Sequence, residues 1–402
     1  MRSGIILIIG CLLIADVLAW CVATRWLKRY ANSRALMWAS HLFFALQSVY
    51  VIILVLAGPE HMQEVAAWIP VWVQAMIYIW HLVFLPAALA LWLLVALAGA
   101  SGYFIHKFRA QQAEAIDTTA SGASDKEFSR RDMLLASVAI VPPLMTMSTT
   151  GYSQATLWQF RVSKMRLPVA GLPAGLEGFR IAHVSDLHVG RWSTRAFLDR
   201  VVDATNSLDA DVVAFTGDLI DISTDDLPLA VETFKRLRAK QGTLIIEGNH
   251  DLIHDPRAFR SAMANERLSF LRGSSVTLKH RRTPIEFMGI PWSRSEQQMR
   301  LDVLAVAANR NIDVFPILLA HHPHAFDAAV EAKLPLTLSG HTHAGQLALN
   351  HTINAGSMLF RYVSGIYQQG TSRLLVSNGT GNWFPLRIGA PAEIIDITLT
   401  RA

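Results

Sequence analysis

Two patterns of apolar residues divide the chain. In the first quarter, apolar residues run almost unbroken through residues 4–24, 35–58 and 68–99. A helix needs about 20 apolar residues to cross a bilayer, and each of these stretches is long enough. The pattern therefore predicts a membrane domain of three transmembrane helices over residues 1–105.

After about residue 157 the pattern changes. Short apolar runs rich in β-branched residues alternate with segments of helical periodicity at residues 193–206 and 226–240. This alternation is typical of a sheet with helices on its outer faces, so we expect one α/β domain over residues 157–402. The strand-like runs are 180–184, 211–216, 243–247, 285–290, 315–320, 334–338, 374–377 and 393–399.

Residues 106–156 join these two parts. A polar stretch rich in Ala, Ser and Thr leads to a weaker apolar segment at about 133–150, which contains two prolines. Arg130 and Arg131 directly precede this segment and resemble a twin-arginine export signature, although two arginines also anchor a helix end on the cytoplasmic side. We expect a cytoplasmic linker followed by a fourth transmembrane segment.

Composition agrees with a globular domain joined to a membrane domain. Apolar residues make up 52% and charged residues 17%, against about 25% charge in an average soluble domain. Only eight charged side chains lie within residues 1–105. Both cysteines lie in the first apolar stretch, which excludes a disulfide framework and a cysteine–metal site. A disordered chain is also excluded.

The distribution of Lys and Arg predicts the orientation in the membrane. The loops at 25–35 and 106–131 carry four and five of these cations, whereas the loop at 59–67 carries none. Because cytoplasmic loops are enriched in Lys and Arg, the first two loops should be cytoplasmic. A crossing at 133–150 then places the α/β domain outside the cytoplasm. Without that crossing the α/β domain is cytoplasmic, and this alternative stays open.

Five polar residues lie at membrane depth: Asp16, His41, Gln47, Gln74 and His81. Polar groups in a bilayer can mark an ion path, but they more often join helices by hydrogen bonds. We expect the second role here.

Polar side chains follow five of the strand-like runs in the α/β domain. Ligands of open α/β sheets bind beyond the carboxyl ends of strands, so we expect one convergent site. Carboxylates, an amide and imidazoles without thiolates suit Mn, Fe or Zn, and the donors are too many for one ion. Two divalent ions sharing a carboxylate fit better. The five blocks are residues 186–188, 218–221, 249–251, 321–324 and 341–343.

In this order the blocks resemble the calcineurin-like metallophosphoesterase superfamily, with its motifs D-x-H, G-D-x-x-D, G-N-H-D, a later His and G-H-x-H. The resemblance covers about residues 165–400 and extends to the membrane-associated bacterial branch. That branch includes twin-arginine-exported phosphodiesterases and a UDP-diacylglucosamine pyrophosphatase. The resemblance implies a four-layer α/β/β/α sandwich, here preceded by an all-α transmembrane region. Ala344 departs from the branch, which usually has Gly at this position.

The resemblance also implies a role for each residue. A hydroxide between two metal ions would attack phosphorus in line. His250 would stabilise the developing charge and protonate the leaving oxygen, and Asp221 would orient His250. One ion would be held by Asp186, His188, Asp218 and His343, and the other by the bridging Asp218 together with Asn249, His321 and His341.

Other polar residues near the blocks receive different interpretations. We expect His183 to lie in the core or to support a ligand, and His322 to be structural. Asp251 suits a cap of the following turn. Arg191 and Gln346 are candidate substrate contacts.

We therefore expect a membrane-anchored dinuclear-metal phosphodiesterase or pyrophosphatase, with a lipid-linked or envelope phosphoester as substrate. The bacterial branch places it in the inner membrane as a multi-pass protein, with the catalytic domain at residues 157–402 on the periplasmic side. One alternative is a UDP-2,3-diacylglucosamine-type pyrophosphatase of lipid A synthesis, which needs a cytoplasmic site. Another is a non-catalytic scaffold or sensor, against which the intact ligand set argues. A nucleic-acid partner is not favoured, because no basic stripe is interleaved with aromatic residues.

Overall fold

The computed structural model describes residues 2–28, 33–57, 68–91, 93, 94, 97, 130–348 and 354–402. The chain forms two compact units, Met1–Gln154 and Ala155–Ala402, each described by itself below. Most of the predicted linker lies outside the described residues. The predicted domain boundaries stay a prediction.

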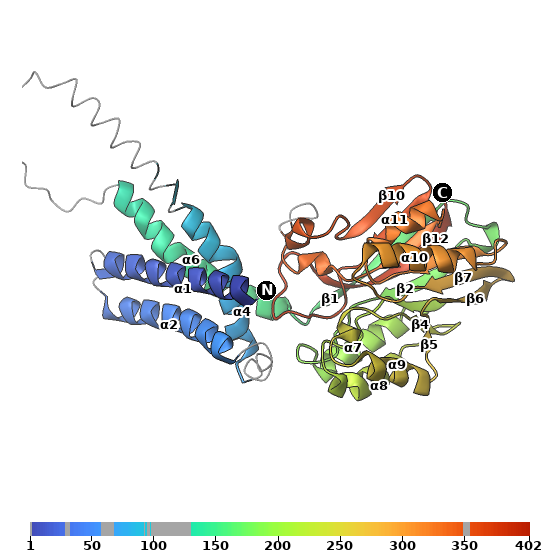
Figure 1. Cartoon of the computed structure of the whole chain (residues 1–402), viewed down its shortest axis with the longest axis horizontal. Coiled ribbons are helices and arrows are strands. Elements are labelled where there is room, and N and C mark those ends of the chain that lie inside the picture. Colours follow the sequence, from blue (N-terminus) through green and yellow to red (C-terminus); the bar gives the residue numbers. More distant parts are fainter. Residues whose placement is uncertain are drawn as a thin grey trace, which may run out of the picture. The chain divides into compact units, whose positions relative to one another are not determined.

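The first unit consists of helices. Three described helical stretches are long and apolar enough to cross a membrane: Ile9–Trp26, Arg34–Ile53 and Val71–Leu91. The segment at 133–150 lies within a single helix that contains Pro142 and Pro143. The helices are α1 (Arg2–Trp26), α2 (Arg34–Ala57), α4 (Val71–Ile79), the π-helix η2 (Trp80–Phe84) and α6 (Arg130–Thr156) (Figure 1).

A buried carboxylate joins three elements of this unit. Asp16 of α1 is fully buried, and its Oδ1 accepts a hydrogen bond from Trp80 Nε1 at 2.7 Å. Its Oδ2 lies 3.0 Å from His81 Nε2 and also accepts a bond from Ser48 of α2 at 3.5 Å. Trp80 and His81 are consecutive, and the π-helical turn that they begin presents both to one carboxylate. These bonds support a role for Asp16 in interhelical hydrogen bonding.

The second unit contains two six-stranded mixed sheets. In the first, β2 to β5 are parallel, and β12 joins this run antiparallel to β2 and parallel to β1. Its order is β1 (Phe160–Val169), β12 (Ala392–Arg401), β2 (Arg180–Val184), β3 (Val212–Phe215), β4 (Thr243–Ile245) and β5 (Ser269–Phe270).

The second sheet has a parallel centre, β7, β8, β9 and β11, with an antiparallel strand at each edge. Its order is β10 (Gly365–Gln369), β11 (Ser372–Val376), β9 (Leu336–Ser339), β8 (Phe315–Leu319), β7 (Thr283–Gly289) and β6 (Ser274–His280).

The two sheets face each other across a common apolar core. Leu167, Ile181 and Val212 of the first sheet share one buried cluster with Phe287 and Ile317 of the second. β3 is buried along its whole length and β2 is buried except at Arg180, as expected of strands that are covered on both faces.

Helices cover the outer face of each sheet (Figure 1). Phe197, Phe234 and Phe259 pack three helices on the first sheet, and Val303 and Phe326 pack two on the second. The resulting helix–sheet–sheet–helix order confirms the predicted four-layer α/β/β/α sandwich. These helices are α7 (Arg195–Asn206), α8 (Leu227–Lys235), α9 (Pro256–Asn265), α10 (Glu296–Ala308) and α11 (Ala325–Glu331), with short 3₁₀ turns at η3 (Ala174–Leu176) and η4 (Thr224–Asp226).

The Asp16 network yields a stability prediction. Asp16→Leu leaves Trp80 and His81 without their acceptor, so it should destabilise the protein in detergent by about 1–3 kcal/mol. Asp16→Asn keeps one acceptor oxygen, so this variant should lose less stability than Asp16→Leu. Thermal unfolding of the three purified proteins measures this order, and equal stability of the Leu and Asn variants would contradict the role assigned to Asp16.

Candidate metal centre

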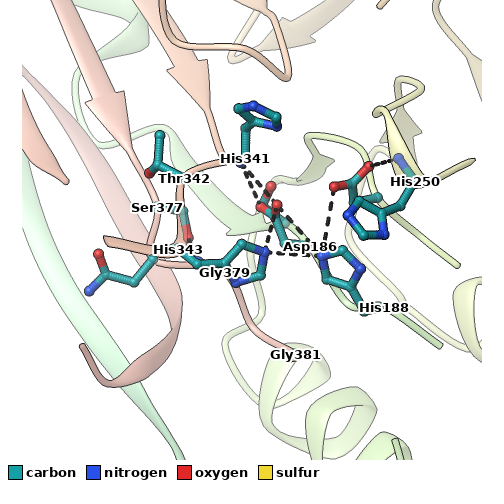
Figure 2. A network of polar contacts seen from close by, with 12 residues as sticks. Asp186, His188, His250, His341, Thr342, His343, Ser377, Gly379 and Gly381 are labelled. Atoms are coloured by element: carbon teal, nitrogen blue, oxygen red, sulfur yellow. Dashed lines mark hydrogen bonds and ion pairs between the residues drawn. The ribbon is translucent and has the colours of Figure 1, made fainter. Parts of the chain in front are cut away.

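The predicted ligands lie just beyond the carboxyl ends of five strands. Asp186 follows β2, Asp218 follows β3 and Asn249 follows β4 in the first sheet. His321 and His341 follow β8 and β9 in the second sheet. Since the parallel strands of each sheet end at one edge, the two sheets bring these loops together (Figure 2).

The first group of ligand atoms contains Asp186, His188 and His343. All three side chains are buried, and one atom of each lies within 4.8 Å of the others. His343 Nε2 is 3.1 Å from Asp186 Oδ1 and 3.0 Å from His188 Nε2. Three potential metal ligands therefore converge at one point (Figure 2).

The second group contains Asp218, His321 and His341. His321 Nε2 is 3.1 Å from both Asp218 Oδ2 and Asn249 Oδ1. His341 presents its Nδ1 atom 3.3 Å from His321 Nε2. Asp218 Oδ2 also lies 3.7 Å from His188 Nε2 of the first group, so this carboxylate stands between the two groups.

The chemistry of these contacts fits two divalent cations. His188 Nε2 faces His343 Nε2, and His341 Nδ1 faces His321 Nε2, with carboxylate oxygens on either side. A carboxylate only accepts hydrogen bonds, and a neutral imidazole has one accepting nitrogen. A cation in each group satisfies these converging lone pairs, and oxygen and nitrogen donors suit a first-row dication.

Two glycines make room for this geometry. A Cβ at Gly248 would overlap the carboxylate of Asp218, and a Cβ at Gly340 would overlap that of Asp186. The loops can therefore approach the ligands only because these positions lack a side chain.

The backbone of the site is strained. Five predicted ligands lie in the left-handed region, where a residue with a side chain costs about 1–3 kcal/mol. Ala344, the departure from the branch pattern, has φ 51° as well, so the usual Gly would relieve backbone strain there. The ligands are Asp186 (φ 54°), His188 (47°), Asp218 (56°), His341 (74°) and His343 (49°).

The electrostatics of the site keep its carboxylates charged. Burial opposes ionisation of Asp218, but His321 and His250 hold its pKa well below the usual range. Asp186 shows the same balance: burial raises its pKa, but His343 and His321 together hold the pKa below its usual range. Burial lowers the pKa of His343 to about 4, which favours the neutral ring that a metal requires.

His250 and Asp221 lie at the edge of the site. His250 Nδ1 is 2.5 Å from the Asp221 carbonyl oxygen and 3.3 Å from its carboxylate, and the His250 side chain is 16% exposed. Burial lowers the pKa of His250, but Asp218 and Asp221 together raise it to about 9. The Asp221 carboxylate also faces His188 Nδ1 at 3.5 Å, so it lies between two rings.

Asp251 has a role that the sequence did not reveal. Its carboxylate accepts four backbone N–H bonds of 2.8–3.0 Å, from Asp218, Leu219, Ile220 and Gly248. Burial and Asp218 raise its pKa to about 7, against the effect of these amide hydrogens. The expected cap of the following turn is wrong, because Asp251 instead ties the loop after β3 to the loop after β4.

Arg387 is a second residue that sequence reasoning missed. It is 3% exposed, and its guanidinium donates to the carbonyl oxygens of Asn378, Gly381 and Ala390. Its NH2 group lies 3.1 Å from His343 Nδ1, so it fixes the ring that the first group needs. The motif Pro-Leu-Arg near the carboxyl end is the only signal for it in the sequence.

Three other sequence interpretations can be compared with the structure. His183 is buried and its Nε2 lies 2.8 Å from Thr216 Oγ1, which agrees with a core role. The interpretation of Gln346 as a substrate contact is wrong, because Gln346 is fully buried and its amide donates to the Leu386 carbonyl oxygen. His322 is half-buried with its ring centroid 4.6 Å from that of His341.

Binding of a divalent metal should stabilise the second unit. A ligand at 100 times its Kd adds about 2.7 kcal/mol to the free energy of unfolding, or about 5–10 °C in Tm. Saturating Mn²⁺ should produce this rise in chelator-treated protein, and Asp218→Asn should reduce it. Asp209→Asn, an exposed carboxylate before β3, serves as the control. An unchanged Tm with Mn²⁺ in the wild type would contradict a metal site.

Asp251 gives a separate stability prediction. Asp251→Asn replaces one acceptor oxygen by a donor that faces two amide hydrogens, which should cost about 2–4 kcal/mol. Asp255→Asn is the matched control, since Asp255 caps α9 and Asn caps a helix as well as Asp does. Chemical denaturation of the two variants compares their stabilities. Equal denaturation midpoints would contradict the role of Asp251 in joining the loops after β3 and β4.

Comparison with known proteins agrees with this geometry. Residues 179–345 match the family model described as calcineurin-like phosphoesterase. A Danio rerio "transmembrane protein with metallophosphoesterase domain" is 32% identical over 60% of this chain and 58% of its own length. A Helicobacter pylori metallophosphoesterase is 31% identical over 55% of this chain and 59% of its own.

A third relative is covered more completely. The metallophosphoesterase YkuE of Bacillus subtilis is 30% identical over 57% of this chain and 81% of its own length. The chain spans about three fifths of the length of the first curated relatives that it matches. With the family match and the extent of this similarity, the chain belongs to the calcineurin-like phosphoesterase family.

Proposed function

We propose that this chain is a membrane-anchored, metal-dependent phosphoester hydrolase that cleaves phosphodiester or pyrophosphate bonds. The observation that carries the proposal is the Asp218 carboxylate, which lies between two separate groups of ligand atoms with His250 beside it. Residues 157–402 would form the catalytic domain, residues 1–105 the membrane domain, and residues 106–156 a linker with a fourth crossing.

Each side chain of the site has a defined task in this proposal. Two divalent cations, when bound, would supply positive charge for the phosphoryl oxygens and lower the pKa of a water molecule. Asp186, His188, Asn249, His321, His341 and His343 would hold them, with Asp218 shared. His250 would donate a proton to the leaving oxygen, held in place by Asp221 and by its own N–H bond to Asp218 Oδ1 at 2.8 Å.

The membrane helices suggest where the substrate lies. Three helices are apolar enough to span a bilayer, and two of the relatives are named as transmembrane proteins. A catalytic domain on such an anchor meets phosphoesters of lipids and of the cell envelope at high local concentration. The cations that precede residues 35–58 and the paired arginines before 133–150 support an extracytoplasmic site.

Turnover measurements test the proposal. Detergent-solubilised full-length protein with Mn²⁺ should hydrolyse a soluble phosphodiester faster than the matching monoester. Asp218→Asn should lower this rate at least about 100-fold, and His250→Gln should have its largest effect on substrates with poor leaving groups. His254→Gln, an exposed histidine four residues further along the chain, is the control and should keep the wild-type rate.

One result would overturn the proposal. If Mn²⁺ raises the Tm but the protein hydrolyses neither diester, monoester nor pyrophosphate, the domain is a metal-binding scaffold.

A further inference from the structure

Exposed apolar side chains gather around the candidate metal centre. Among the described residues of 155–402, seven large hydrophobic side chains are prominently exposed. Four of them lie on loops that contact the site, and we name these four the apolar rim. The rim consists of Ile253 (48% exposed), Met358 (86%), Leu359 (77%) and Trp383 (41%).

The rim flanks the site on two sides. On one side, the ring of Trp383 lies 6.1 Å from that of His250, and Ile253 follows His250 by three residues. On the other side, Phe360 packs its ring 5.2 Å from that of His341, and Met358 and Leu359 directly precede it. Apolar side chains of the rim therefore lie beside both His250 and His341.

The loop that presents Met358 is built into the fold. It forms the 3₁₀ turn η7 (Ala355–Met358), in which Asn354 Oδ1 accepts the N–H of Ser357 at 2.8 Å. Gly356 is buried and packs against Gly345 of η6 (His343–Gly345), directly beside the ligand His343. The exposure of Met358 thus belongs to an ordered turn attached to the site.

Such exposure calls for a covering partner. Exposed Met, Leu and Trp side chains are stabilised when they leave water, so a cluster of them marks an interaction surface. The chain itself points to a membrane as this partner. Three of its described helical stretches are long and apolar enough to cross a bilayer, and only three residues separate α6 from β1. Trp383 also suits the boundary between headgroups and acyl chains.

We propose that the apolar rim inserts into the lipid headgroup region and places the metal centre directly over the phosphate layer. This inference rests on the proposed function and narrows its substrate class. An amphipathic phosphoester then reaches the metal centre with its hydrocarbon chain still in the bilayer.

Lipid quenching of a fluorophore tests the insertion. In full-length protein with Cys11→Ser and Cys21→Ser, Met358→Cys is labelled with a polarity-sensitive dye. The protein is placed in nanodiscs of phosphatidylethanolamine and phosphatidylglycerol with spin-labelled acyl chains. Ile312→Cys is the control, because Ile312 is 84% exposed but precedes β8, at the end of that strand opposite His321.

The expected result is a blue-shifted emission at position 358 that is quenched at least about twofold more than at position 312. Equal behaviour of the two positions would overturn the inference. A blue shift at 358 without lipid quenching would also overturn it, since the rim would then be covered by protein, either a second copy or residues 1–154 of the same chain.

An activity measurement separates this inference from the proposed function. Met358→Asp with Leu359→Asp should lower the ratio of lipid-diester to soluble-diester turnover about tenfold, and Ile312→Asp should leave the ratio unchanged. An unchanged ratio in the double variant would contradict the rim's role. If no diester is hydrolysed at all, the proposed function fails, and the fluorescence result still decides whether the rim inserts.

Discussion

The structure depends on holding two carboxylates and four imidazoles close together in a buried place. Carboxylates of Asp186 and Asp218 and four imidazoles have ligand atoms a few ångströms apart, and most of them are fully buried. Five of the ligands also have strained left-handed backbones. Such an arrangement persists only where the surrounding structure fixes each loop, and bound cations would remove the repulsion that remains.

The surroundings supply that rigidity at two levels. The double sheet provides strand ends that are buried on both faces and shared by one apolar core. Beyond the strands, Asp251 joins two ligand loops through four amide hydrogens, and Arg387 ties His343 to the loop before β12. The chemistry of the site and the stability of the fold are therefore coupled through the same hydrogen bonds.

The sequence predicted the central strands and missed several edge strands for one physical reason. Buried strands such as β2 and β8 are continuous apolar runs, whereas β1, β6 and β10 lie at sheet edges and mix exposed with buried positions. The same rule applied to the site residues, because motifs that directly follow a continuous apolar run could be recognised in the sequence. Asp251 and Gln346 were misread, because a sequence shows which groups are present but not which way they point.

In the proposed site, Asp218 is shared by two metal ions. Anomalous diffraction from crystals soaked in Mn²⁺ measures this directly. We expect two peaks about 3.5–4 Å apart on either side of the Asp218 carboxylate, one near Asp186 and one near His321. A single peak, or none, would contradict it.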